Sequence, residues 1–200
     1  MKFKFFGCTI NITLFFMAML ALLLYFDKSG MMLLGIGAIF IHETGHLIMM
    51  KALRRMPEEI ILQPAGVIIK TKTGLTGYHG DILIALSGCA ANGIAAILSS
   101  LIYVNNRSIV FLLYSLINTI MALFNLIPVE GLDGGDVLRF LLQKKLSITK
   151  ADKIVKVISF AFIVIIIIFG IYLVLCKQFN VTILFSGFYL TVLMLLNLRE

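Results

Sequence analysis

Five long runs without a charged residue most constrain how this chain can fold. They cover residues 5–26, 82–106, 108–129, 157–176 and 178–198. The shortest has 20 residues, and about 20 apolar residues in an α-helix cross the hydrocarbon core of a bilayer. A sixth run, residues 30–50, is equally apolar except for one interruption. Because a helix satisfies its own backbone hydrogen bonds in lipid, the pattern predicts an all-α polytopic membrane protein with about six transmembrane helices.

Composition and charge agree with this fold class. Hydrophobic residues make up 60% of the chain and charged residues 14%, against about 25% charged residues in soluble domains. The net charge of +7 does not indicate nucleic acid, because the basic residues follow the predicted topology. With six helices alternating from a cytoplasmic amino terminus, the Lys and Arg residues that face outward are Lys28, Arg107 and Lys177, three of 17. This asymmetry follows the positive-inside rule and predicts that both termini are cytoplasmic.

Two polar segments interrupt the predicted helices. The residues at 60–73, between the second and third helices, contain Gln63-Pro64-Ala65-Gly66, with proline and glycine placed as in a tight turn between β-prone runs. We expect a small β-hairpin here, at the cytoplasmic side of the membrane. The residues at 137–146 form a predicted short helix with three basic residues, which suits either the anionic membrane interface or a plain connection.

The interruption of the sixth run, His42-Glu43-Thr44-Gly45-His46, has the H-E-x-x-H pattern. Residues four apart share one face of a helix, so His42 and His46 can direct both imidazoles at one Zn²⁺ ion. Glu43 points about 100° around the helix and suits a water on the metal, whose pKa zinc lowers to about 7. Ionisable residues within a span cost about 2.5–3.5 kcal/mol each on insertion scales. This cost argues against a chance match and predicts a metal site.

A third protein ligand is expected after the fourth predicted helix. Pro128 ends that helix, and Gly134-Gly135 are expected to let the backbone turn sharply. Asp133 would then project back toward the membrane from the cytoplasmic side, which is also the side of His46. The alternative for Asp133 is an N-cap of the next helix. His79 lies in a glycine-rich loop, and we expect it to be a solvated interfacial residue.

The three cysteines, Cys8, Cys89 and Cys176, lie in separate predicted helices and lack Cys-x-x-Cys spacing. They indicate neither a disulfide framework nor a thiolate metal site. We expect all three to be buried structural thiols.

Three spaced motifs resemble those of the site-2 protease family of intramembrane zinc metalloproteases. The first is H-E-x-G-H at 42–46, and the second is N-x-x-P followed by L-D-G-G at 125–135. The third is Ser87-Gly88-Cys89-Ala90-Ala91-Asn92, in which Cys89 stands where the family has proline. The resemblance covers residues 30–140. With no room for a PDZ or CBS domain, the chain is most similar to the bacterial branch of stage IV sporulation protein FB.

The resemblance implies a zinc centre with a general base. His42, His46 and Asp133 would be the ligands of one Zn²⁺ per chain, and Glu43 would be the catalytic base. A single membrane-embedded domain at 1–200, with core motifs at 30–140 and C-terminal helices at 157–198, would then be an intramembrane zinc metalloprotease. Its substrate would be a transmembrane protein or membrane-tethered pro-protein, cut in or next to a transmembrane segment on the cytoplasmic side.

The resemblance also implies substrate-binding residues. Asn125 and Asn92 would orient the substrate backbone or stabilise the oxyanion. The alternative for both asparagines is hydrogen bonding between packed helices, worth about 1 kcal/mol. Gly66 resembles the start of a family strand that accepts an unwound substrate by β-addition, with a simple interfacial turn as its alternative.

The resemblance places the chain in a bacterial cell membrane as a multi-pass protein. Its partners would be the bilayer and the substrate, with a regulatory membrane partner left open. Two other functions use the same residues, namely metal transport and a non-catalytic zinc-binding scaffold. Transport predicts acidic or histidine residues along a path to both faces, which the sequence lacks. A scaffold needs no general base, so an intact Glu43 argues against it.

Overall fold

The computed structural model describes residues 2–5, 8–57, 59–63, 66–70, 77–176 and 182–197. The chain forms two compact units, the first of Met1–Thr76 and Ser87–Ala122, the second of Gly77–Leu86 and Leu123–Glu200. The helices α3 (Tyr78–Asn106) and α4 (Ile109–Asn125) contribute to both units. That the whole chain acts as one catalytic domain stays a prediction.

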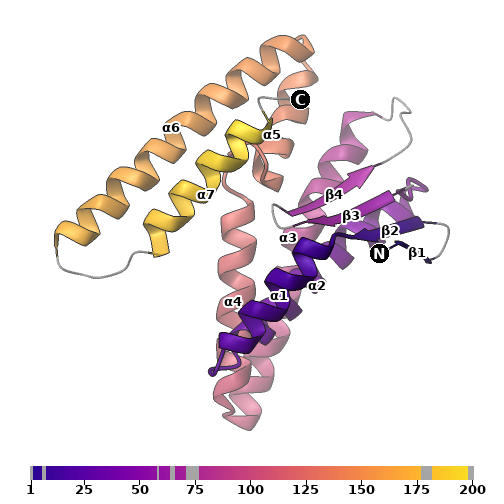
Figure 1. Cartoon of the computed structure of the whole chain (residues 1–200). Coiled ribbons are helices and arrows are strands. Elements are labelled where there is room, and N and C mark those ends of the chain that lie inside the picture. The colour runs from indigo at the N-terminus through magenta and orange to yellow at the C-terminus, as the bar shows by residue number, and fades with distance from the viewer. Residues whose placement is uncertain are drawn as a thin grey trace. The chain divides into compact units, whose positions relative to one another are not determined.

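The first unit contains a four-stranded sheet that an all-α fold does not include (Figure 1). Its strands lie in the order β1-β2-β3-β4, so β4 is an edge strand. They are β1 (Lys2–Phe5), β2 (Cys8–Ile12), β3 (Glu59–Gln63) and β4 (Gly66–Lys70). The central pair, β2 and β3, is parallel, and the two outer pairs are antiparallel.

The prediction of one helix over 5–26 is therefore wrong in its first part. Residues 8–12 pair with β3 in the register Thr9↔Glu59 to Ile12↔Leu62, and their β-branched side chains favour a pleated strand. The helix α1 (Leu14–Phe26) begins only after Thr13, whose Oγ1 accepts a hydrogen bond of 3.3 Å from the backbone N–H of Phe16. The absence of charge shows that residues 8–12 are apolar, but pairing with β3, which is distant in the sequence, decides that they form a strand.

The strands β3 and β4 form an antiparallel hairpin between α2 and α3 in the chain, with the register Glu59↔Lys70 to Gln63↔Gly66. The segment 60–73 therefore does contain paired strands. The turn residues Pro64 and Ala65, together with Glu58, lie outside the described residues. Placement of the hairpin at the cytoplasmic side stays a prediction.

Three of the described helices are long and apolar enough to cross a membrane. They are α2 (Met31–Ala52), α3 and α6 (Ile148–Leu175). Three further apolar helices are shorter: α1, α4 and the stretch Ile183–Leu195 within α7 (Thr182–Asn197). The predicted apolar runs thus correspond to helices, while the count of six membrane crossings stays a prediction.

In the second unit, α6 and α7 lie side by side (Figure 1). Glycines allow this close approach, since a Cβ at Gly187 would lie 2.8 Å from Cγ1 of Ile167, and one at Gly170 would lie 3.2 Å from the backbone of Leu184. A buried core of Val129, Leu132, Ile163 and Leu190 joins these helices to the loop before α5 (Asp133–Gln143). Asp133 directly follows that loop, as the first residue of α5, and belongs to the second unit.

Candidate metal centre

His42 and His46 lie one turn apart on α2 and are both buried, with 4% and 7% of their surfaces exposed. Their Nε2 atoms are 3.2 Å apart. Two nitrogens bound to one tetrahedral zinc at about 2.0–2.1 Å lie about 3.3 Å from each other. The spacing of the two nitrogens therefore fits chelation of a single ion, as the motif predicts.

The His42 ring is held on its other side by a buried polar chain. Its Nδ1 lies 2.6 Å from Oδ1 of Asn92, which is fully buried on α3. The Asn92 amide donates to the carbonyl of Ala38 at 3.0 Å and to Oδ1 of Asn118 at 2.8 Å. Asn118, on α4 and also fully buried, donates to the carbonyl of Tyr114 at 2.8 Å. Metal-binding histidines characteristically have such a partner on the second ring nitrogen.

Two glycines bring α2 against α3 at this point. A Cβ at Gly45, inside the H-E-x-x-H motif, would lie 2.6 Å from the carbonyl oxygen of Ser87. A Cβ at Gly88 would collide with Nε2 of His46 and would lie 2.8 Å from Cε1 of His42. Gly45 thus provides close helix packing, and Gly88 provides room for the two imidazoles.

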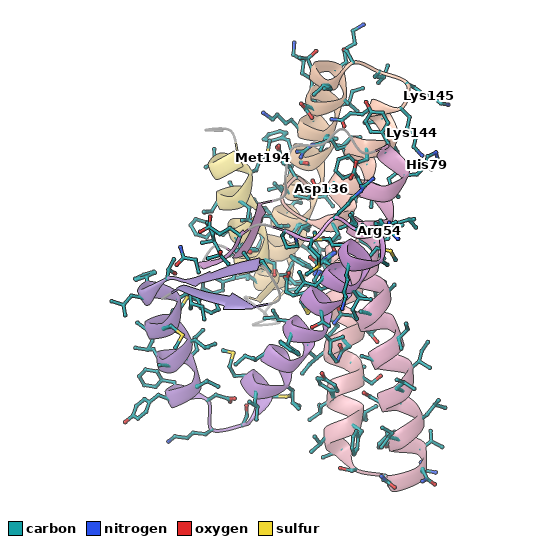
Figure 2. The ribbon with its side chains drawn as sticks, turned by 90° about the vertical axis from the view of Figure 1, so that its right-hand side faces the viewer. Arg54, His79, Asp136, Lys144, Lys145 and Met194 are labelled. Carbon is teal, nitrogen blue, oxygen red and sulfur yellow. The ribbon has the colours of Figure 1, made fainter. Side chains whose placement is uncertain are left out.

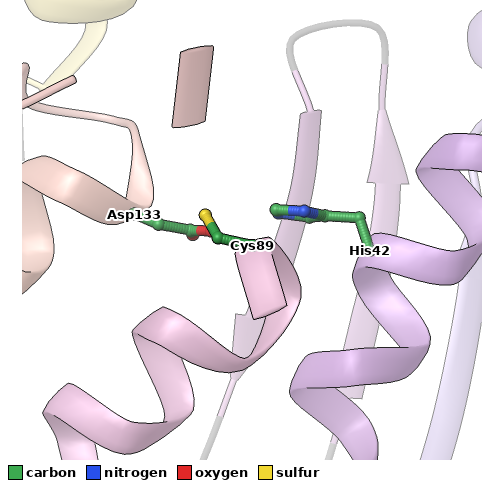
Figure 3. Close-up of side chains that lie close together, drawn as sticks. All are labelled: His42, Cys89 and Asp133. Atoms are coloured by element: carbon green, nitrogen blue, oxygen red, sulfur yellow. The ribbon is translucent and has the colours of Figure 1, made fainter. Parts of the chain in front are cut away.

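Cys89 is a neighbour of the histidine pair, although its sequence context predicts only a structural thiol. It is buried on α3, and its Sγ lies within 4.8 Å of a ring nitrogen of His42 (Figure 3). The signal that could have found it is its position in the third motif, because a thiolate can bind metal and the proline expected at that position cannot. Its predicted burial is confirmed, whereas Cys176 is exposed, which corrects that prediction. The side chain of Cys8 lies outside the described residues.

Asp133, also labelled in Figure 3, is in the first turn of α5 in the second unit. Leu132 is the N-cap of this helix, so the alternative that Asp133 caps it is wrong. The expected sharp turn at Gly134-Gly135 is also wrong, because both residues are helical and the left-handed φ of +92° belongs to Gly131. A Cβ at Gly134 would lie 2.6 Å from the carbonyl oxygen of Ile127. These glycines let the preceding loop pack on the first turn of α5.

Glu130, three residues before Asp133, is engaged in an ion pair with Arg139. It is buried, with 4% of its surface exposed, and its Oε1 lies 2.9 Å from Nη2 of Arg139. Its backbone N–H donates to Oγ of Ser159 on α6 at 2.8 Å. Arg139 also lies 3.2 Å from Asp136 and 3.3 Å from Asp152. This ion-pair network holds the loop before Asp133 onto α5 and α6.

The remaining predicted residues are placed as follows. Glu43 is half-buried on α2, and Asn125 is half-buried at the end of α4. Gly66 begins the edge strand β4 opposite Gln63. His79 is exposed, as expected, in the first turn of α3, and its Nδ1 lies 3.3 Å from Nζ of Lys144 (Figure 2).

Known proteins resemble this chain in sequence and in fold. Residues 102–167 match the family model of Peptidase family M50. A zinc metalloprotease of Methanocaldococcus jannaschii is 32% identical over 140 residues, which is 67% of this chain and 40% of the relative. The chain thus spans about two fifths of the length of that relative.

A solved structure shows the same fold. The site-2 protease from Methanocaldococcus jannaschii aligns with a TM-score of 0.69 over 97% of this chain and 93% of that one, at 24% identity. Together, the two sequence matches support a similarity of this chain to Peptidase family M50.

Proposed function

We propose that this chain is a member of Peptidase family M50 and an intramembrane zinc metalloprotease. It would hydrolyse a peptide bond in or next to a transmembrane segment of its substrate. The observation that carries this proposal is the convergence of two buried Nε2 atoms, 3.2 Å apart, on a helix long enough to cross a membrane. A carboxylate, Glu43, adjoins the pair in the sequence.

The proposed ligands of one Zn²⁺ per chain are His42, His46 and Asp133. Asp133 is preferred to Glu130 as the third ligand because Glu130 is already paired with Arg139 inside the second unit. A carboxylate oxygen with two imidazoles is a donor set typical of catalytic zinc, which keeps its fourth position for water or substrate.

Cys89 is left outside this ligand set because a fourth protein ligand would close the centre to water. Its distance from His42 nevertheless makes it a competitor. Cobalt substitution tests the choice, since a thiolate ligand gives a sulfur-to-cobalt charge-transfer band. We expect this band to be absent and the Cys89→Ala protein to keep its zinc.

When bound, zinc supplies Lewis acidity to the scissile carbonyl and lowers the pKa of water at the site. Glu43 takes a proton from the attacking water while the water oxygen forms a bond to the carbonyl carbon. It then gives this proton to the leaving nitrogen as the carbon–nitrogen bond breaks, so that the products are a carboxylic acid and an amine. His42, His46 and Asp133 would hold the ion.

We assign substrate binding to the edge strand β4 and to Asn125. An edge strand offers unpaired backbone groups, and an unwound peptide can pair with them by β-addition. Gly66 would begin this contact, and Asn125 would orient the substrate backbone. The substrate would be a transmembrane protein or membrane-tethered pro-protein, cut at the cytoplasmic side of a bacterial cell membrane in the manner of the sporulation branch.

The experiment that tests the function compares the termini of membrane proteins in cells that carry the wild type or Glu43→Gln. We expect new ends within or beside transmembrane segments only with the wild type, while both purified proteins contain zinc. Cleavage by Glu43→Gln at the wild-type rate would remove Glu43 from the role of base. A zinc-loaded wild type that generates no new ends, in cells or with a reconstituted panel of membrane proteins, would favour the scaffold.

A further inference from the structure

We propose that Asn92 and Asn118 are positioning residues that set the tautomer of His42, so that Nε2 is its metal-binding nitrogen. The link to zinc rests on the proposed function, whereas the tautomer can be measured without any metal. Two backbone carbonyls orient two side-chain amides, and these amides fix the position of the proton on the imidazole.

The first carbonyl orients Asn118. The amide of this residue contacts the carbonyl oxygen of Tyr114, one turn earlier on α4, at 2.8 Å. A carbonyl oxygen can only accept a hydrogen bond, so the amide nitrogen of Asn118 must face it. The amide oxygen of Asn118 is therefore directed at Asn92 on α3, 2.8 Å away.

The second carbonyl orients Asn92. One end of its amide faces both the carbonyl oxygen of Ala38 at 3.0 Å and the amide oxygen of Asn118 at 2.8 Å. Both neighbours are acceptors, so this end must be the nitrogen, which has two hydrogens to donate. The other end is then the oxygen, and it faces Nδ1 of His42 at 2.6 Å.

The position of the proton on the His42 imidazole follows from the orientation of the Asn92 amide. An amide oxygen only accepts, so Nδ1 of His42 must carry the proton. A neutral imidazole has one ring proton, which leaves Nε2 as the acceptor nitrogen, and it is this atom that lies 3.2 Å from Nε2 of His46. The opposite tautomer would set two acceptor atoms against each other at 2.6 Å. Asn92 and Asn118 are fully buried, so bulk water does not compete for these hydrogen bonds.

A neighbouring pair of serines forms an ordinary hydrogen bond between two packed helices. Ser100 and Ser115 join α3 to α4 through a 2.7 Å contact between their hydroxyls, and Ser115 also donates to the carbonyl of Ala96 at 2.9 Å. Like Asn118, Ser115 is buried on α4. Neither of these hydrogen bonds involves a histidine, so Ser115→Ala removes an α3–α4 hydrogen bond without affecting the imidazole.

The test uses the full-length protein in detergent, with ring-¹⁵N histidine. His46→Gln and His79→Gln variants assign the three histidine signals. In the metal-free wild type, at a pH of about 8 where free histidine is neutral, we expect the proton of His42 on Nδ1. In Asn92→Ala we expect a mixture of tautomers and a zinc affinity lower by about ten- to a hundredfold, the usual effect of losing such a partner. Ser115→Ala should match the wild type in both measurements.

The proposal is overturned if the proton of wild-type His42 is on Nε2, a result that needs no variant to fold. It is also overturned if Asn92→Ala keeps the wild-type zinc affinity, or if Ser115→Ala loses as much affinity as Asn92→Ala. A wild type with the expected tautomer that binds no zinc would instead refute the proposed function, since the tautomer measurement is independent of the metal.

Discussion

A single methyl group added at Gly88 should displace both histidines of the candidate metal centre. A Cβ at this position would lie 2.7 Å from Cε1 of His46 and 2.8 Å from Cε1 of His42. Non-bonded carbon atoms settle at about 3.5–4.0 Å, so each ring must move by roughly 0.7–0.8 Å. Zinc sites tolerate deviations of about 0.2 Å in their ligand distances. We therefore expect Gly88→Ala to lose zinc affinity by about ten- to a hundredfold, the usual loss when the contacts that orient metal-binding histidines are disturbed.

The assay is competition for zinc with a chromophoric chelator, on protein whose helical content has been checked by circular dichroism. Gly93→Ala is the matched control, because Gly93 is on the same helix α3 and its added Cβ would have no neighbour within 4 Å. Alanine is favoured over glycine in a helix by about 1 kcal/mol. The control should therefore bind zinc like the wild type and be no less stable.

Wild-type zinc affinity in Gly88→Ala would refute the packing of the two imidazoles against Gly88. An equal loss in Gly93→Ala would show that α3 tolerates no added methyl group, and it would remove the specific argument from the ring contacts. Loss of helical content in Gly88→Ala alone would mean that the added methyl group unwinds part of a helix and does not simply displace the rings.

Three further predictions concern the second unit and the turn between α1 and α2. Asp133→Ala should lower the zinc content of the purified protein several-fold, and unchanged stoichiometry by metal analysis would move the third ligand elsewhere. Arg139→Met should destabilise the protein by roughly 3 kcal/mol in thermal or denaturant unfolding, because it leaves Glu130 buried without its cation, and adding Glu130→Gln should recover most of this loss. The Ser29 hydroxyl and then the backbone N–H of Met32 hold the pKa of Asp27 below its usual 3.8, so this turn is stabilised above pH 3.8 and loses that stabilisation as the pH falls through the lowered pKa. Protection of the Met32 amide from hydrogen exchange should fall there, and an Asp27→Asn variant with the same pH profile would contradict the assignment.

Much of this molecule could be predicted from local patterns in the sequence. The apolar runs predicted helices because about 20 residues without charge suffice to cross a bilayer, and each run contains a helix, although residues 8–12 are a strand. The spacing of His42 and His46 placed both imidazoles on one face because the helical repeat puts residues four apart in register. Pro64 and Gly66 between β-prone runs indicated the hairpin of β3 and β4. Each of these features depends on residues only a few positions apart.

The tertiary structure decided the features that depend on residues far apart in the chain. Residues 8–12 are a strand because β3 lies beside them some 50 positions later, and no periodicity within 5–26 contains that information. Gly134 is required by the carbonyl of Ile127 that packs against it, although its sequence favoured a turn. Asn92 contacts His42 from α3, and Asn118 contacts Asn92 from α4. The sequence by itself determined that His42 and His46 could bind one metal ion. Long-range packing decided that Cys89 lies near His42 and which nitrogen of His42 is presented for binding, since contacts between separate helices have no local signature.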